Sequence, residues 1–114
     1  MHIINITGSN MELTEAIKDY TTKKITTLKK YLVDYSPVDV TIEVGQTTNR
    51  QNKGKIFKAE VNLKIPGNFI RATETAEDLY EAIDKVKDHL QRQIVDLKNK
   101  MTDKTIRVPR PDKE

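Results

Sequence analysis

Two stretches near the middle of the chain alternate strictly between apolar and polar residues, and this pattern limits the possible folds more than any other feature. Apolar residues occupy every second position of residues 38–44 and again of residues 57–65. A period of two is that of a β-strand with one buried face and one exposed face. The pattern therefore predicts a sheet that is covered on one side only, with other parts of the chain supplying the cover.

Two further strands are expected beside this pair. Residues 66–68 (Pro-Gly-Asn) are a strong turn signal, so residues 69–74 should return as the second arm of an antiparallel hairpin. Residues 2–7 are rich in β-branched side chains and precede Gly-Ser-Asn at residues 8–10, which predicts a first strand that ends in a turn. The polar residues 47–54 are expected to form a loop.

The first of two amphipathic segments follows the first strand. Apolar residues recur there at steps of three and four as far as Leu32, which is the spacing of one helix face. Thr14 is favoured over Ser9 as the N-cap, because residues 8–10 are better suited to a turn. We expect this helix to end near Asp34.

The second amphipathic segment has an apolar stripe from Leu79 to Met101, and Thr75 with Asp78 precedes it at capping-box spacing. The element order is then β-α-β-β-β-α. Because the strands bury only one face, this order predicts an α+β fold, a two-layer sandwich with a four-stranded sheet and both helices on one face. The first two strands should be parallel, and the others should form an antiparallel meander.

A chain of 114 residues is the size of one domain. We expect this domain in residues 1–103 and a flexible basic tail in residues 104–114, where helical periodicity is lost. No signal peptide is recognised, and no apolar stretch approaches the roughly 18 residues of a membrane helix. Together with the absence of cysteine, these features favour a cytoplasmic protein.

Signatures of catalysis or of a cofactor are scarce. The four glycines are scattered, so the sequence has no Gly-rich phosphate-binding loop. The two histidines, His2 and His89, have no partner at metal-ligand spacing, and there is no cysteine nucleophile. The sequence therefore predicts a protein that is not an enzyme and that uses no metal or cofactor.

The overall charge is nearly balanced, so a basic surface can arise only by segregation of charge. Twenty lysines and arginines stand against 17 acidic residues, and residues 98–114 alone hold an excess equal to the net charge of +3. Two helices on the same sheet face would bring their cations side by side, where they could bind nucleic-acid phosphates. These cations are Lys18, Lys23, Lys24, Lys29 and Lys30 in the first helix, and Lys85, Lys87, Arg92, Lys98 and Lys100 in the second.

Other interpretations remain open at this point. A lysine-rich outer face is also the ordinary solvated face of an amphipathic helix. The chain could instead be a generic structured-RNA-binding module, or a protein-interaction module that uses the open sheet face around residues 58–64. Because aromatic residues are few, recognition of RNA should depend on backbone and shape rather than on base stacking.

Several separated motifs then point to a known family. The family comprises the ribosome hibernation promoting factors and the related ribosome-associated inhibitor of translation. Its motif Asp-Met-Tyr-x-Ala-Ile-Asp resembles residues 77–84 (Glu-Asp-Leu-Tyr-Glu-Ala-Ile-Asp). Its motif Leu-x-Arg-Gln-Leu resembles residues 90–94 (Leu-Gln-Arg-Gln-Ile). Residues 12–17 and 28–31 agree as well. The resemblance covers roughly residues 1–101, and the motifs stand in the same order as in that family.

The resemblance implies both a fold and a function. The family's fold is β-α-β-β-β-α, similar to double-stranded RNA-binding domains. Its members bind the small ribosomal subunit in the channel that mRNA and the A- and P-site tRNAs use. They block translation in stationary phase or stress, and some promote inactive ribosome dimers. We therefore expect a ribosome hibernation factor whose partner is ribosomal RNA of the decoding region, and which is monomeric away from the ribosome.

The resemblance, together with the helix cations, also selects RNA-binding positions. The predicted RNA-binding residues are Lys24, Lys30, Arg71, Lys87, His89, Arg92, Lys98 and Lys100. His89 stands where relatives often have lysine, and Asp96 stands where another basic residue is common, so Asp96 should repel phosphate if it faces RNA. Long relatives add a second, dimerising domain, so this chain is expected to be a short form or the N-terminal part of a long one. The basic tail favours the short hibernation-promoting type over the inhibitor, whose tail is acidic.

Overall fold

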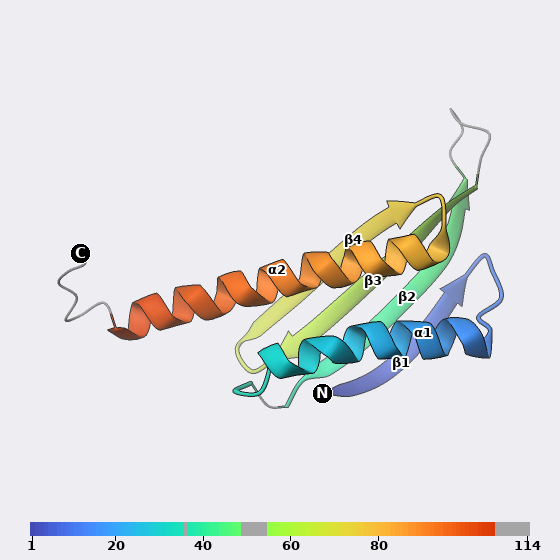
Figure 1. Cartoon of the computed structure of the whole chain (residues 1–114). Helices are drawn as coiled ribbons and strands as arrows, with labels where there is room; N and C mark the ends of the chain where they lie inside the picture. The colour runs from blue at the N-terminus through green and yellow to red at the C-terminus, as the bar shows by residue number, and fades with distance from the viewer. Residues whose placement is uncertain (36, 49–54, 107–114) are drawn as a thin grey trace.

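The structure, a computed structural model, describes residues 1–35, 37–48 and 55–106. The elements follow the predicted order β-α-β-β-β-α (Figure 1). They are β1 (His2–Ser9), α1 (Glu15–Thr26), the short 3-10 helix η1 (Thr27–Tyr31), β2 (Asp39–Thr48), β3 (Lys55–Ile65), β4 (Asn68–Ala76) and α2 (Leu79–Ile106).

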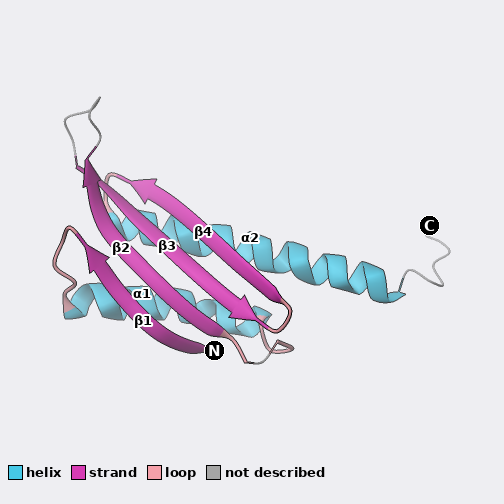
Figure 2. Cartoon of the chain, turned by 180° about the vertical axis from the view of Figure 1, so that it is seen from behind, coloured by secondary structure: helices cyan, strands magenta, loops and turns pink. Residues whose placement is uncertain are grey.

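The four strands form one sheet in the order β1-β2-β3-β4. β1 pairs with β2 in parallel, and the pairs β2–β3 and β3–β4 are antiparallel. Both helices lie against the same face of this sheet, and the other face is open (Figures 1 and 2). The predicted α+β sandwich, with its parallel first crossover and its antiparallel meander, is therefore confirmed.

The core lies between the sheet and the two helices. The alternating residues of the central strands point into it, and Val40, Val44, Val61 and Leu63 are all fully buried. The helices close the core with their own buried apolar residues, Ile17, Ile25, Leu28, Ile83, Val86, Leu90 and Ile94. Removal of each such side chain from water is worth about 1.5–3 kcal/mol, so this layer contact determines which face each helix presents to solvent.

The first helix begins as predicted but ends earlier. The Thr14 side chain caps α1, with its hydroxyl oxygen accepting the Ile17 N–H at 3.2 Å. At the other end the chain tightens into η1 and leaves helical geometry after Tyr31, before the predicted end near Asp34. The Thr27 hydroxyl donates to the Lys24 carbonyl at 2.6 Å. Such a local bond competes with regular helix hydrogen bonds, which is consistent with the change to 3-10 geometry.

The sheet also extends further than local signals predicted. Gly8 and Ser9 belong to β1 instead of a turn, and the turn is made by Asn10, whose φ is 58°. Ser9 pairs with Gly45 of β2, and a Cβ atom at Gly45 would lie only 2.8 Å from the Ser9 carbonyl oxygen. The absence of a side chain at Gly45 therefore allows this parallel pair to continue to its end.

Thr75 was predicted to open the second helix, but it lies in β4 opposite Lys58. Pairing with β3 across this strand outweighs the local capping signal. α2 begins at Leu79, and the preceding Asp78 supplies the carbonyl that accepts the Ala82 N–H at 3.0 Å. At its other end α2 continues to Ile106, past the predicted end of its apolar stripe.

Parts of two predicted segments lie outside the described residues. These are residues 49–54 of the predicted loop and residues 107–114 of the predicted tail. Within the described ranges, none of the helices is both long and apolar enough to span a membrane.

Candidate nucleic-acid interface

The two helices lie side by side and run in the same direction (Figure 1). The rings of Tyr20 and Tyr80 meet edge to face with centroids 4.7 Å apart. One turn further along both helices, the Lys24 ammonium lies 3.4 Å from the Asp84 carboxylate. The beginnings of α1 and α2 are therefore neighbours, and the end of α1 with η1 lies beside the middle of α2, which continues past it (Figure 1). Charges that lie late in the first helix and in the middle of the second therefore collect in one part of the layer.

The leading ends of the two helices are acidic. Residues 12–22 and 77–84 hold seven acidic residues and one lysine, a net of −6. They are Glu12, Glu15, Asp19, Glu77, Asp78, Glu81 and Asp84, with Lys18. Carboxylates near a helix N-terminus are stabilised by the helix dipole, so this distribution also favours the helices themselves.

The trailing ends of the same helices are basic. Residues 23–31 and 85–100 hold nine lysines and arginines and two aspartates, a net of +7. The cations are Lys23, Lys24, Lys29, Lys30, Lys85, Lys87, Arg92, Lys98 and Lys100. We call these cations together the basic end of the helix layer. Because α2 continues past η1, its last cations, Lys98 and Lys100, extend this region along α2 beyond the first helix (Figure 1). This region is the candidate interface for a polyanion.

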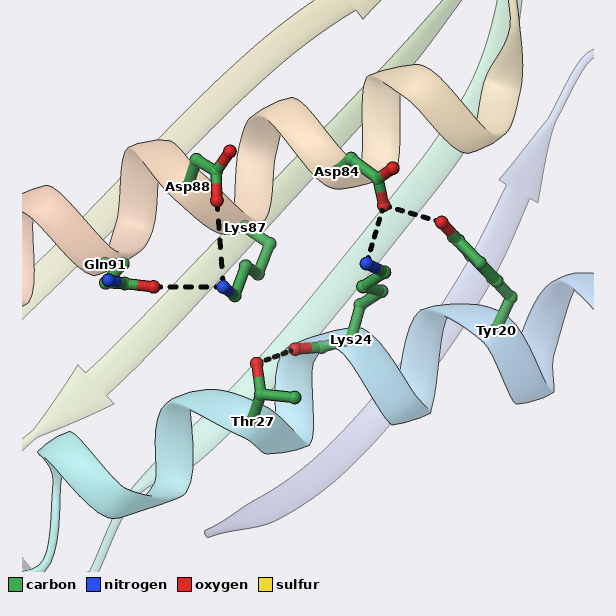
Figure 3. A network of polar contacts seen from close by, with 7 residues as sticks. All are labelled: Tyr20, Lys24, Thr27, Asp84, Lys87, Asp88 and Gln91. Atoms are coloured by element: carbon green, nitrogen blue, oxygen red, sulfur yellow. Dashed lines mark hydrogen bonds and ion pairs between the residues drawn. The ribbon is translucent and has the colours of Figure 1, made fainter.

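Two of the predicted RNA-binding lysines, Lys24 of α1 and Lys87 of α2, lie between the two helices, and each already has a polar partner (Figure 3). Lys24 is held by Asp84, as described above. The Lys87 ammonium lies 3.0 Å from the Gln91 amide oxygen and 3.7 Å from the Asp88 carboxylate. Each lysine therefore has a carboxylate within ion-pair distance, and this part of the basic end is nearly neutral.

Tyr20 completes this interhelix contact. Its hydroxyl donates a hydrogen bond of 2.7 Å to Asp84 Oδ1, the oxygen that also contacts Lys24 (Figure 3). The hydrogen bond to Asp84 raises the pKa of Tyr20 to about 12, with burial and the charges of Asp84 and Asp78 adding to the effect. The phenol therefore stays protonated near neutral pH and remains a donor to the carboxylate.

The other predicted helix cations have no such partners. Lys30, Arg92, Lys98 and Lys100 make no hydrogen bond or ion pair with any other described residue. The Lys30 ammonium lies 5.3 Å from the centroid of the Tyr31 ring, a cation–π contact that leaves its charge in place. These four side chains therefore carry most of the uncompensated charge among the predicted positions.

Lys23 and Lys29 belong with them, although the family resemblance did not select them. Both are exposed, and within the described residues neither has a hydrogen-bonding or ion-pairing partner. The sequence already placed both among the first-helix cations that could bind phosphates. In the structure Lys29 lines a pocket with Met1 and Tyr35, so it lies on the side of the first helix next to the start of β1.

His89 lies on a different flank of α2, against the edge strand β4. Its Nδ1 is 2.9 Å from a carboxylate oxygen of Glu74. One turn before and one turn after it, Lys85 and Gln93 donate to the β4 carbonyls of Thr75 and Arg71, at 3.3 and 2.9 Å. Lys85 and Gln93 thus attach α2 to the sheet edge by hydrogen bonds. His89 lies between them within ion-pair distance of Glu74, but its buried Nδ1 has no hydrogen-bond partner among the described residues.

Asp96 and Lys100 lie on this flank as well. Both line a pocket of about 290 Å³, together with Phe69, Gln93 and Leu97. The pocket lies beside the start of β4, whereas the contacts between Lys24, Lys87 and their partners lie on the side of α2 that faces α1. Asp96 and Lys100 therefore lie on the β4 flank of the basic end, away from the side of α2 that faces α1.

Arg71 is separated from all the helix cations by the sheet. Its Nε donates to the Asn62 amide oxygen at 2.7 Å and lies 3.7 Å from Glu60, and its guanidinium lies 5.7 Å from the centroid of the Phe69 ring. These residues alternate with the buried ones, so they lie on the open face. A single flat RNA surface cannot contact Arg71 and the helix cations together.

Metal binding finds no support in the part of the chain that the structure describes. Among the described side chains, those of residues 1–35, 37–47 and 56–100, no group of three or more histidine, aspartate and glutamate residues is placed to hold an ion. The candidate interface is thus made of lysine and arginine side chains.

Comparison with known proteins identifies a family. The model of the family described as "Sigma 54 modulation protein / S30EA ribosomal protein" matches residues 4–102. The chain is 36% identical over 94 residues to the ribosome hibernation promotion factor of Deinococcus radiodurans, a match that covers 82% of this chain and 48% of that protein. It is 33% identical over 98 residues to the ribosome hibernation promoting factor of Escherichia coli K12, covering 86% of this chain and 95% of that one.

Solved structures agree with the fold. The N-terminal domain of Thermus thermophilus Protein Y superposes with a TM-score of 0.64 at 32% identity, covering 82% of this chain and 96% of that domain. A ribosomal subunit interface protein from Coxiella burnetii superposes with a TM-score of 0.71, covering 87% of this chain and 99% of the other, and at 24% identity it supports the fold alone. The chain thus spans about half the length of the Deinococcus relative and nearly all of the Escherichia one.

Proposed function

The chain belongs to the Sigma 54 modulation protein / S30EA ribosomal protein family, and on this basis we propose that it is a ribosome hibernation factor that binds the small ribosomal subunit. The observation that supports the proposal beyond family membership is the basic end of the helix layer, where both parallel helices contribute cations that have no partner among the described residues. Such a role is exercised in the cytoplasm and requires no catalysis.

The proposed mechanism is steric and electrostatic. Cations held on two rigid helices bind ribosomal RNA phosphates, because release of the counterions condensed on RNA favours such contacts. Phe69 is the one aromatic side chain on the open face of the strands, and the helix interface offers no row of exposed rings for base stacking. A domain bound in this way in the mRNA and tRNA channel prevents translation, because it occupies the space that the A- and P-site ligands need.

The site assignment is tested by removing equal charge from the two faces. Lys30→Gln with Arg92→Gln removes two unpaired cations from the basic end. Lys58→Gln with Lys64→Gln removes two cations from the open sheet face and serves as the matched control. We expect the first variant to bind purified small subunits more weakly, with a log–log salt dependence shallower by about two units, since each phosphate contact contributes about one. The control should bind like the wild type.

Equal loss of binding in both variants would show that net charge, not the helix face, controls association. Equal affinity of the wild type for a plain RNA duplex and for small subunits would instead identify a generic RNA binder. Sucrose-gradient sedimentation of ribosomes with and without the protein then tests whether the protein also promotes the pairing of ribosomes into dimers. A larger dimer peak in the presence of the protein indicates that it promotes pairing, and comigration with single ribosomes and subunits at an unchanged dimer peak indicates binding without pairing.

A further inference from the structure

We propose that Asp84 limits the affinity of the helix layer for RNA by competing with phosphate for the ammonium group of Lys24. The inference rests on the proposed function, because it assumes that the basic end of the helix layer contacts phosphates. It adds a residue of opposite charge to the interface, one whose removal should strengthen binding.

The carboxylate of Asp84 is placed where a phosphate oxygen would be expected. Its Oδ1 lies 3.4 Å from Lys24 Nζ and accepts the Tyr20 hydroxyl at 2.7 Å (Figure 3). It therefore takes one charged contact and one hydrogen bond from α1, which are the two kinds of contact that proteins make to phosphate. Asp84 itself belongs to α2, so the contact joins the two helices.

Both members of the ion pair remain accessible to a ligand. The Lys24 side chain is 39% exposed and that of Asp84 is 45% exposed. A phosphate can thus reach the ammonium group, but it must displace a carboxylate or tolerate one beside it. The Lys24 ammonium also lies 5.6 Å from the centroid of the Tyr20 ring, which further favours its place between the helices.

Tyr20 makes Asp84 an effective competitor. A carboxylate that accepts a phenol hydrogen bond is fixed in orientation, and the raised pKa of Tyr20, about 12, keeps this donor protonated near neutral pH. Tyr20 is therefore a positioning residue, because it acts on Lys24 through Asp84. Asp84 also lies at the boundary between the acidic and the basic ends of the layer, where it can limit how far along the helices phosphates bind.

The test compares two variants that each remove one negative charge from α2. Asp84→Asn removes the competitor and keeps an oxygen that can accept the Tyr20 hydroxyl. Glu81→Gln is the matched control, because Glu81 lies one turn earlier, is exposed and has no ion-pair partner among the described residues. Both are combined with Lys24→Gln, and binding is measured against small ribosomal subunits and against a plain RNA duplex over a series of salt concentrations.

We expect Asp84→Asn to bind about two- to five-fold more tightly, the range expected for release of an exposed ion pair. Its salt dependence should steepen by about one unit, as for one additional phosphate contact. Glu81→Gln should gain less than half as much. In the Lys24→Gln background Asp84→Asn should give no gain beyond that of Glu81→Gln, because the group that it releases is absent.

An equal gain from Asp84→Asn and Glu81→Gln, or a gain that persists without Lys24, would overturn the inference, since general electrostatics would then explain it. Failure of the proposed function can be distinguished from failure of the inference about Asp84, because both RNA targets are measured. If the protein binds the duplex with the expected pattern but does not bind small subunits, the role of Asp84 stands and the ribosomal partner is wrong. If it binds neither, both proposals are wrong.

A readout independent of RNA shows whether Asp84 contacts Tyr20 in solution. Asp84→Ala removes both the charge and the acceptor, so it should lower the pKa of Tyr20 from about 12 toward the ordinary 10.0, visible as earlier phenolate absorbance in an alkaline titration. An unchanged titration would show that the carboxylate does not hold this position, and would also overturn the inference.

Discussion

At the scale of single residues, the polar contacts of this protein join elements that are distant in sequence. Tyr20 and Asp84 are 64 positions apart and bond at 2.7 Å. His89 reaches Glu74 on the neighbouring strand. Such contacts decide which charged side chains are compensated, and so they divide a set of chemically equivalent lysines and arginines into paired and unpaired ones.

Tyr20 makes a prediction about the pH dependence of stability. Because its pKa is raised in the folded protein, from 10.0 to about 12, the folded state favours the protonated phenol more than the unfolded state does. The stabilisation by Tyr20 is therefore complete below about pH 10 and is lost as pH rises from 10 through 12. We expect wild type to be more stable than Tyr20→Phe near neutral pH, and this advantage to disappear across that window.

The measurement is urea unfolding of both proteins at a series of pH values. The comparison between them is necessary because lysines also titrate in this range, and their contribution is common to both. A difference in the free energy of unfolding that stays constant to pH 12 would contradict the assigned hydrogen bond to Asp84.

Residue-level expectations succeeded where the cause is local. Thr14 was identified as an N-cap because its partner, Ile17, is only three positions away. The predicted RNA-binding roles of His89 and Arg71 stay predictions, but their partners Glu74, Asn62 and Glu60 could not be read from the sequence. Each of these partners is brought close by strand pairing or by helix docking, which local sequence does not determine.

At the scale of elements, different flanks of α2 make different kinds of contact. One flank packs in the core, one attaches to β4 through hydrogen bonds of Lys85 and Gln93, and one faces α1 (Figure 3). The periodicity of the sequence predicted the core flank, because apolar residues mark it directly. It could not separate the other two flanks, because both carry polar and charged residues.

Strand and helix limits were predicted less well for a related reason. β2 and β3 continue to the pair Thr48 and Lys55, beyond the alternating residues that marked them. Thr75 joined a strand although its local pattern suits a helix cap. In each case hydrogen bonds to a neighbouring strand extended the element, and such bonds depend on sequence that lies elsewhere in the chain.

The division of α2 into flanks predicts that stability and binding respond to different residues two positions apart. Leu90 is fully buried, and Arg92 is exposed without a described partner. Leu90→Ala should lower the free energy of unfolding by about 2–5 kcal/mol, through lost burial and the cavity left behind. Arg92→Gln should change it by no more than about 0.5 kcal/mol. Urea unfolding measures both.

At temperatures where both variants are folded, binding should be affected more by Arg92→Gln than by Leu90→Ala, the opposite of the order expected for stability. Arg92→Gln should weaken association with small subunits, and Leu90→Ala should leave it close to wild type. A large loss of stability in Arg92→Gln would mean that its side chain supports the fold, and its selection as an interface residue would then be unfounded.

At the scale of the whole molecule, the dominant feature is the polarity of the helix layer. A net charge of +3 conceals a net of −6 at one end of the helices and +7 at the other. The sequence shows that each helix is polarised, but only the parallel arrangement, fixed by Tyr20 with Tyr80 and Lys24 with Asp84, adds the two polarities together. Antiparallel helices with the same sequences would nearly cancel them.

This polarity predicts that the acidic end contributes to specificity. A uniform RNA duplex presents phosphates along its whole length, so a carboxylate-rich end restricts the orientations in which the helix layer can bind it. Neutralising that end should therefore raise affinity for a duplex more than affinity for the small subunit, where the proposed site admits a single orientation. Glu12→Gln with Glu77→Gln is suitable, because both residues are exposed and precede their helices.

The control is Asp39→Asn with Glu43→Gln, which removes the same charge from β2. Both residues alternate with buried ones, so their side chains lie on the open sheet face. We expect the ratio of subunit affinity to duplex affinity, measured at one fixed salt concentration, to fall in the first variant and to stay near wild type in the second. An equal change in both ratios would show that the acidic end acts only through net charge. An unchanged ratio in the first variant would show that discrimination between the ribosome and other RNA resides in the basic end alone.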